Sequence, residues 1–475
     1  MTPDRFPPDP YPADPYPADP YPSNASPAEL RRAVVERYVA RTMESKRAHE
    51  RASRVLPAGV NRNIVHHGPH PMFVASGAGP YLTDLDGNRY LDLIGNYTAM
   101  ILGNCVPQVM EAAARQLALG TAWAGASPGE ADLAEMIVER LPSAELVRFA
   151  ASGTEATMMA LRAARAFTGR PAIAKFEGGY HGIHDVAMIS VAPDPDASGP
   201  DDAPLSVATP GIAPSAAADV LVLPFNDADA VTKLIGKNAH RLAAIVVEPV
   251  LANAGLLEPA PGFLETLRDL ATKHGIVLIF DEVITLRIAW GGAQSHYGVT
   301  PDMTTLGKII GGGYPIGAIA GRADIMNWFD PTRPGGSVTL SGTFHAAPMA
   351  LAAGVETLKL FTADAIAALN ARSARLAGEL RAMFADASLT LSLNQVGSLL
   401  NVHAMAENVS RYRAGARGDK AFLKLLHLAL LNEGVLVSPR GLFCLSVPMG
   451  EPEIDAIRDA FARALAALGV LGAGK

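Results

Sequence analysis

The sequence predicts an α/β protein in which a mostly parallel sheet is covered by helices. From about residue 111 to residue 320, helical stretches alternate with short aliphatic runs: LVRFAA, AIAKF, DVLVLP, AAIVVEP, IVLIFDE and IGAIAG. Strands that are apolar on both faces are typical of parallel sheets, which carry helices on each side. A chain of 475 residues is also long enough for a large core and for roughly three domains.

Composition narrows the possible functions and locations. The chain is 49% hydrophobic and 18% charged, with a net charge of -7, which suits a globular enzyme and argues against nucleic-acid binding. Its two cysteines, Cys105 and Cys444, are too few and too far apart for a disulfide framework or a zinc site. We therefore expect a cytoplasmic protein without a metal. No signal-peptide pattern or membrane-spanning apolar run is present, so no membrane association is expected either.

Four regions are expected along the chain. Residues 1–26 repeat Asp-Pro-Tyr-Pro-Ala, which predicts a disordered, partly polyproline II tail, with a docking segment for a partner as the alternative. Residues 27–80 should form an N-terminal helix and a segment that joins the small domain. Residues 81–346 should form the large domain, and the helix-rich residues 347–475 a smaller α+β domain.

Three features fill in these regions. The stretch SPAELRRAVVERYVARTMESKRAHERASRVL has the start signal and periodicity of one charged amphipathic helix that begins near Pro27. In PYLTDLDGNRYLDLIG, the pair Asp86-Gly87 predicts a hairpin turn between two short strands. Residues 192–217, rich in Pro, Asp, Ser and Ala, predict a surface excursion from the alternating pattern.

The stretch RFAASGTEATMMALRAARAF predicts a strand that runs into Ser152-Gly153-Thr154 and then a long helix. Ser152 with Glu155 fits a capping box, and glycine lets backbone N–H groups approach a ligand closely. Hydroxyl groups, free N–H groups and the positive end of a helix together favour phosphate binding. Every capped helix shares these features, so a helix start without a ligand is an equal alternative.

The stretch HGIVLIFDEVITLR predicts a buried strand that ends at Asp281, on the edge where open parallel sheets bind ligands. A cap for the next segment is the structural alternative. Nucleotide-hydrolysing enzymes also place an aspartate on such a strand, but they require GxxxxGK[ST]. Neither Gly236-Lys237 nor Gly307-Lys308 has the earlier glycine or the following hydroxyl, so we exclude an ATPase.

The stretch TTLGKIIGGGYPIGA places Lys308 among glycines and aliphatic residues, with no other charge nearby in sequence. Burial disfavours the charged form of a lysine and lowers its pKa, as a nucleophilic or basic amine requires. The alternative is a lysine whose ammonium reaches solvent from a core segment. Pyridoxal phosphate requires a phosphate site, a buried carboxylate and a buried lysine together. We therefore infer pyridoxal phosphate as the cofactor.

Several motifs resemble class III aminotransferases of the fold type I pyridoxal phosphate family, and the resemblance covers about residues 30 to 465. It implies a large domain with a mostly parallel seven-stranded sheet and a smaller α+β domain. GGAQSHYGVTPDMTTLGKIIGGG is especially similar to glutamate-1-semialdehyde aminomutases. The motifs are Ser152-Gly153-Thr154-Glu155-Ala156, Gly179-Tyr180-His181-Gly182, Glu248-Pro249-Val250, Asp281-Glu282-Val283 and the lysine stretch.

The resemblance implies catalytic roles for two residues. Lys308 would carry the cofactor as a Schiff base and then move the substrate proton, while Asp281 would pair with the ring nitrogen. Ser152, Gly153 and Thr154 would hold the phosphate.

Further cofactor contacts are implied in the same way. Thr343 of SGTF would reach the phosphate from the partner subunit, which implies a homodimer with the active site at the subunit interface. Tyr180 would stack on one face of the ring, Val283 would pack on the other, and Glu248 would lie near the ring oxygen. Ala151 departs from the family pattern, because relatives commonly have asparagine there.

Two arginines are candidates for substrate binding. Arg62 follows a glycine turn and Arg440 lies in a turn before a strand. The planar guanidinium fork suits bidentate carboxylate binding, although a solvent-exposed loop arginine is as good an interpretation of either. Their sequence settings, with NYTAMILG and SPRGLFCLS, look like those of aminotransferases that act on β-phenylalanine. Tyr97 is a weaker pocket candidate, and we assign no role to His66, His67 and His70.

These expectations combine into one reaction. The protein would move the amino group of a β-amino acid, such as the aromatic β-phenylalanine, to 2-oxoglutarate or pyruvate, through the Lys308 Schiff base and pyridoxamine phosphate. A glutamate-1-semialdehyde-type 2,1-aminomutase, which needs no acceptor, is the alternative, as is an aminotransferase for another amine donor. A non-catalytic family member is disfavoured because no catalytic position is missing.

Overall fold

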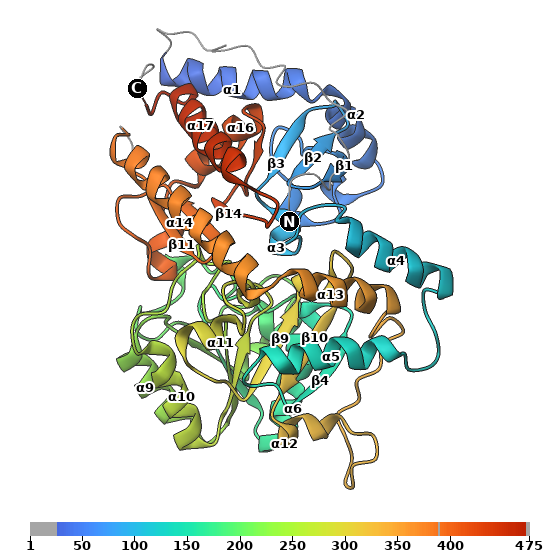
Figure 1. Cartoon of the computed structure of the whole chain (residues 1–475). Coiled ribbons are helices and arrows are strands. Elements are labelled where there is room, and N and C mark those ends of the chain that lie inside the picture. The colour runs from blue at the N-terminus through green and yellow to red at the C-terminus, as the bar shows by residue number, and fades with distance from the viewer. Residues whose placement is uncertain (1–25, 388–389, 472–475) are drawn as a thin grey trace.

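The computed structural model describes residues 26–387 and 390–471. Its large sheet has seven strands in the order β4-β10-β9-β8-β7-β5-β6 (Figure 1). β10 runs antiparallel to both neighbours, and the other neighbouring strands are parallel. The strands are β4 (Leu146–Ala150), β10 (Gly317–Gly321), β9 (Met303–Gly307), β8 (Val277–Asp281), β7 (Leu242–Val247), β5 (Ala172–Phe176) and β6 (Val220–Leu223).

Helices bury both faces of this sheet, as continuously apolar strands require. On one face, α6 (Gly153–Thr168) packs against alternate strand residues such as Val246 and Ile279. On the other, α10 (Phe263–His274) packs against the intervening residues, including Val247 and Phe280. The predicted α/β class with a mostly parallel, helix-covered sheet is therefore confirmed.

The six aliphatic runs all form strands, but the interior strand β9 was not predicted. Its sequence, MTTLG, does not form an aliphatic run. Both threonines are nevertheless fully buried, because their hydroxyl groups are hydrogen-bonded: Thr304 to Ser143 and Thr305 to Asp281. A satisfied hydroxyl costs little to bury, so a threonine can occupy a core strand position.

The remaining strands form two smaller sheets at one end of the large sheet (Figure 1). The order in one is β1-β2-β3-β13, and in the other β11-β12-β14. The expected boundary at residue 81 falls between β1 and β2, although these strands are paired. We therefore propose to move it beyond β3. The strands are β1 (Val74–Ala78), β2 (Tyr81–Asp84), β3 (Arg89–Asp92), β11 (Ser392–Val396), β12 (Leu399–His403), β13 (Val435–Leu436) and β14 (Leu442–Cys444).

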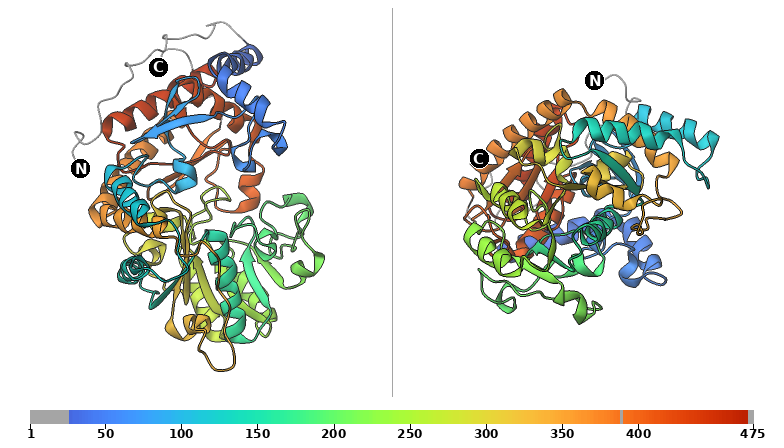
Figure 2. Two further views of the ribbon diagram at one scale, coloured as in Figure 1. Left: turned by 90° about the vertical axis from the view of Figure 1, so that its right-hand side faces the viewer. Right: turned by 90° about the horizontal axis from the view of Figure 1, so that it is seen from below.

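The N-terminal and C-terminal helices lie side by side in this smaller part, as Figures 1 and 2 show. α1 (Pro27–Arg41) packs against α16 (Lys420–Asn432) and α17 (Glu451–Ala467). None of the helices in the described ranges combines the length and apolar character that a membrane span requires.

The single N-terminal helix expected from the sequence is divided in the structure. α1 ends at Arg41 and α2 (Met43–Ala52) follows, with Thr42 outside helical geometry at φ -125° and ψ 42°. The Thr42 hydroxyl donates to the Tyr38 carbonyl at 2.6 Å, a local bond that competes with helix geometry. The hairpin turn is confirmed, with Gly87 at φ 81°, whereas residues 1–25 of the predicted tail lie outside the described ranges.

Candidate active site

The predicted catalytic residues lie together at one edge of the large sheet. Lys308 follows β9, Asp281 ends β8, Glu248 follows β7, and Tyr180 lies in the turn after β5. These four strands are parallel, and β9, β8 and β7 are direct neighbours. Their carboxyl ends therefore meet at the edge where open α/β sheets bind ligands.

Asp281 is held by two side chains to which the sequence analysis gave no role. The side chain of His181 approaches it with Nδ1 2.8 Å from Oδ2, and the Thr305 hydroxyl donates to Oδ1 at 3.0 Å. Burial lowers the pKa of His181, so the neutral ring donates from Nδ1, and its buried Nε2 has no partner among the described residues. The GYHG motif contained His181, but only the fold shows that its ring faces a carboxylate on another strand.

Glu248 follows the neighbouring strand β7, and its protonation differs from that of an ordinary carboxylate. Its carboxyl group accepts the backbone N–H of Tyr180 at 2.9 Å and that of Ala252 at 3.3 Å. Burial, aided by the negative charge of Asp281, raises the pKa of Glu248 to about 8. Near neutral pH this carboxyl group is therefore largely protonated and can donate a hydrogen bond to a ligand.

Lys308 combines an unusual backbone with an unpaired amine. Its φ of +50° lies in the left-handed region, which non-glycine residues rarely adopt and which occurs mostly at functional sites. Burial lowers its pKa to about 8, although the charges of Asp281 and Glu248 oppose the change. No hydrogen bond to its amine is found within the described residues. The amine is thus free and close to deprotonation, as a nucleophile must be.

The predicted phosphate cup lies at the start of α6. The Ser152 hydroxyl caps this helix by accepting from the Glu155 backbone N–H at 3.2 Å. The Glu155 carboxylate does not complete the expected capping box, because it accepts instead from Ala151 at 2.7 Å. The first N–H groups of a helix have no intrahelical partner, so those of Gly153 and Thr154 can bind an anion.

Close packing joins this cup to the rest of the site. A Cβ added at Gly153 would lie 3.1 Å from Val283, and one at Gly182 would lie 2.6 Å from the Thr154 hydroxyl. At Gly182 only glycine permits this approach, because its φ is +95° and Thr154 lies too close for a side chain, whereas at Gly153 the Val283 side chain would have to shift. The cup therefore packs directly against Val283 and against the turn after Tyr180.

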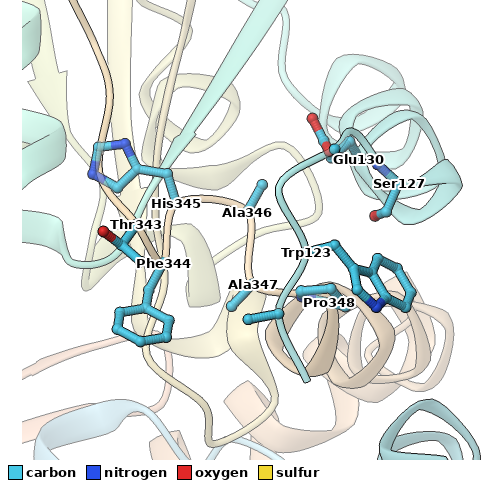
Figure 3. Close-up of a pocket in the computed structure, with 11 residues that line it drawn as sticks. Trp123, Ser127, Glu130, Thr343, Phe344, His345, Ala346, Ala347 and Pro348 are labelled. Carbon is cyan, nitrogen blue, oxygen red and sulfur yellow. Dashed lines mark hydrogen bonds between the residues drawn. The ribbon is translucent and has the colours of Figure 1, made fainter. Parts of the chain in front are cut away.

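Thr343 lies apart from the cup of its own chain. It is exposed, and Figure 3 shows it next to Phe344 and His345 at a hollow that is also lined by Trp123 and Glu130. Its loop contacts α6 through His345, whose Nε2 is 3.1 Å from Glu155. Within the part of the chain described, Thr343 makes no hydrogen bond to residues 152–154.

The three predicted substrate residues lie in turns and short helical segments outside the strands of the smaller sheets. Arg62 lies over the Tyr97 ring, with its guanidinium carbon 5.8 Å from the ring centroid. Burial raises the pKa of Tyr97, and the positive charges of Arg440 and Arg62 oppose that rise, so both act on the same phenol. Arg440 also acts on Tyr180, which links this group to the strand-end residues. Its guanidinium has no carboxylate partner among the described side chains.

Comparison with known proteins places the chain in one family. The pattern of the family described as Aminotransferase class-III matches residues 64–464. A glutamate-1-semialdehyde 2,1-aminomutase from Methanothermobacter thermautotrophicus is 41% identical over 430 residues, which cover 90% of this chain and 100% of that protein.

Three solved structures share the fold. An omega-transaminase from Sphaerobacter thermophilus is 42% identical with a TM-score of 0.86, over 90% of this chain and 98% of that one. A β-phenylalanine aminotransferase from Variovorax paradoxus is 36% identical with a TM-score of 0.86, over 94% and 98%. A transaminase with PLP bound is 35% identical with a TM-score of 0.84, over 90% and 98%. The chain therefore belongs to the class III aminotransferases, enzymes of the fold type I architecture.

Proposed function

We propose that the protein transfers the amino group of a β-amino acid to 2-oxoglutarate or pyruvate, with β-phenylalanine as the first donor to test. The observation that carries the proposal is the pair of arginines whose positive charges both act on Tyr97, together with the free amine of Lys308. The similarity to a β-phenylalanine aminotransferase supports it. An aromatic donor would find Tyr97 and Tyr180 beside the carboxylate-binding groups.

The residues present fit pyridoxal phosphate as the cofactor. Its phosphate would be held by the N–H and hydroxyl groups of residues 152–154, and its ring would lie between Tyr180 and Val283. Asp281, backed by His181, would pair with the ring nitrogen, and the protonated Glu248 would donate to the ring oxygen. When bound, the cofactor supplies an electron sink for the charge that develops on the substrate carbon.

Lys308 would bind the cofactor covalently and then, once displaced by the donor amine, act as the base. Its lowered pKa allows the free amine to take the proton from the substrate carbon and return it elsewhere. In a β-amino acid the carboxylate lies one carbon further from the reacting carbon than in an α-amino acid. One pocket must therefore bind donor and acceptor carboxylates at different distances, and Arg62 and Arg440 are suited to share that task.

A homodimer would complete this site. Thr343 is exposed and cannot reach the cup of its own chain by any contact seen here, so its phosphate contact would be made in a second copy. Large exposed apolar side chains beside the same hollow, including Trp123 and Phe344, support such an interface (Figure 3).

A 2,1-aminomutase is the second candidate, supported by the 41% identity to a glutamate-1-semialdehyde 2,1-aminomutase. The two reactions differ in their need for an acceptor. An aminotransferase stops after one turnover per site without a 2-oxo acid, whereas an aminomutase continues without one.

The test is a single turnover of cofactor-loaded protein with β-phenylalanine and no acceptor. We expect one equivalent of the 3-oxo acid per site, followed by renewed turnover when 2-oxoglutarate is added. Glutamate-1-semialdehyde, converted without an acceptor while β-phenylalanine is left unchanged, would establish the aminomutase instead.

The role of Arg440 has its own test. Arg440→Ala should raise the KM for 2-oxoglutarate about tenfold, because one charge-assisted carboxylate contact is lost. The matched change Arg241→Ala removes a partly exposed arginine that pairs with Asp219, where both residues precede their strands at the opposite edge of the sheet. If the KM responds equally to both changes, Arg440 does not contact the acceptor.

A further inference from the structure

The turn that carries Tyr97 has a strained backbone. Asn96, Tyr97 and Thr98 have φ values of 49°, 56° and 75°, so three consecutive non-glycine residues lie in the left-handed region. Such a conformation is costly for a non-glycine residue and persists only where the surroundings fix it. The residues around this turn therefore indicate its role.

Buried side chains anchor this turn from the interior. The Asp92 carboxylate accepts the backbone N–H groups of Ile94 at 3.2 Å and Gly95 at 2.8 Å. At the other end, the fully buried Arg287 donates to the Thr98 carbonyl at 3.5 Å. The backbone of Asn96 and Tyr97 is thus held by a carboxylate below one end and a guanidinium below the other.

The outer side of the turn holds the segment that carries Arg62. The amide oxygen of Asn96 accepts from Nη1 of Arg62 at 2.8 Å, and the Tyr97 hydroxyl donates to the Ile64 carbonyl at 2.6 Å. An amide oxygen orients a guanidinium without cancelling its charge, and it uses only one of five N–H donors. A carboxylate at the same place would pair with that charge.

We propose that Asn96 is a positioning residue that determines specificity. It fixes the direction of the Arg62 guanidinium toward the carboxylate of the amino donor and leaves the positive charge available. This inference rests on the proposed function, because it takes Arg62 to be the donor-carboxylate residue. Asn96 itself need not touch the substrate.

Two substitutions of Asn96 distinguish its effect on the orientation of the Arg62 guanidinium from its effect on the charge of that group. Asn96→Asp keeps the size of the side chain and places a competing carboxylate on Arg62, so the dissociation constant for 3-phenylpropanoate should rise about tenfold. Asn96→Gly removes the amide where glycine adopts the left-handed backbone without cost, and should give a rise of about threefold. 3-Phenylpropanoate has the carboxylate of the donor and no amine, so calorimetric binding measures this contact without turnover.

A matched control and a double-mutant cycle make the test specific. Asn63→Asp adds the same charge one residue from Arg62, at an exposed side chain with no hydrogen bond to Arg62 in the structure, and should change binding less than about twofold. In an Arg62→Ala background, Asn96→Asp should have no further effect, because the two residues act as a unit. For β-phenylalanine turnover, the Asn96→Asp change should fall on KM and not on kcat.

Three results would overturn the inference: unchanged binding in both Asn96 variants, an equal effect of Asn96→Asp with and without Arg62, or normal binding by Arg62→Ala. The melting temperatures of all variants identify any that fail to fold. Asn96→Gly is the variant for which misfolding is least expected. The proposed function fails if the wild-type protein forms no 3-oxo acid from β-phenylalanine. That result is distinguishable from failure of this inference, because the coupling between residues 62 and 96 is measured by binding alone.

Discussion

Two lysines lie at the same edge of the large sheet, one fully buried and one half-buried, and their surroundings are opposite. Lys175, in β5, is 0% exposed and donates to the carbonyls of Gly179, Ala187 and Ile189 at 3.0, 2.8 and 2.5 Å. Lys308, after β9, has no hydrogen-bond partner among the described residues. The three carbonyls satisfy the amine of Lys175, which therefore has a structural role, whereas the amine of Lys308 is left for a ligand.

The comparison also explains how the turn after β5 keeps its shape. The Lys175 ammonium ties together the residues on both sides of Tyr180 and His181. Burial lowers the pKa of both lysines, to about 7 for Lys175 and about 8 for Lys308. Similar pKa values therefore accompany different roles, and it is the hydrogen bonding that distinguishes them.

The largest expected effect comes from Lys308→Ala. We expect turnover to fall by about 10⁴-fold, because the covalent group and the base are removed together. Borohydride reduction followed by intact-mass measurement should show cofactor attached to the wild-type chain and none attached to the variant. Turnover that survives the substitution would refute the assignment.

Lys175→Met should instead affect stability. The change leaves three carbonyls without a donor, and we expect the free energy of unfolding to fall by about 3 kcal/mol. Lys308→Met is the matched control, since the same substitution there removes no hydrogen bond and should not destabilise the cofactor-free protein. Chemical denaturation of both variants measures the difference. Equal losses at the two positions would remove the contrast between them.

The pH dependence of stability gives a smaller effect. Without cofactor, Lys308 has a pKa of about 8 in the folded chain and about 10.5 when unfolded. Between these values the unfolded state binds the extra proton, so wild-type stability should rise with pH relative to Lys308→Met, by about 2 kcal/mol between pH 8 and pH 10. Denaturation midpoints from pH 7 to 10.5 test this, and parallel curves for the two proteins would contradict it.

The smallest expected effect separates the electrostatics of the two lysines. The charge of Asp281 raises the pKa of Lys308, whereas the charge that raises the pKa of Lys175 comes from Glu248. Asp281→Asn should lower the pH midpoint for titration of the Lys308 amine and leave that of Lys175 in place. NMR of the cofactor-free protein with ¹⁵N-labelled lysine reads both amines without a reagent, and a common shift would show that the sites are not independent.

Much of the catalytic edge could be predicted because each residue there follows a local signal. An uninterrupted aliphatic run marks a buried strand, and the polar residue directly after it, as with Glu248 or Asp281, must lie at the strand end. The same logic failed for β9, since MTTLG is not an aliphatic run. The helix division at Thr42 depends on one side-chain bond, which no periodicity reveals.

The sequence by itself determined the fold class, the strand ends and the lysine, aspartate and glycine-rich stretches of the site, because these are properties of short continuous segments. Only the tertiary structure decided which side chains meet: His181 with Asp281, Asn96 with Arg62, and Arg62 with Tyr97. Strand order, crossover packing and the placing of the smaller sheets set these contacts between distant segments. They are fixed by burial and pairing across the whole chain, which no local pattern encodes.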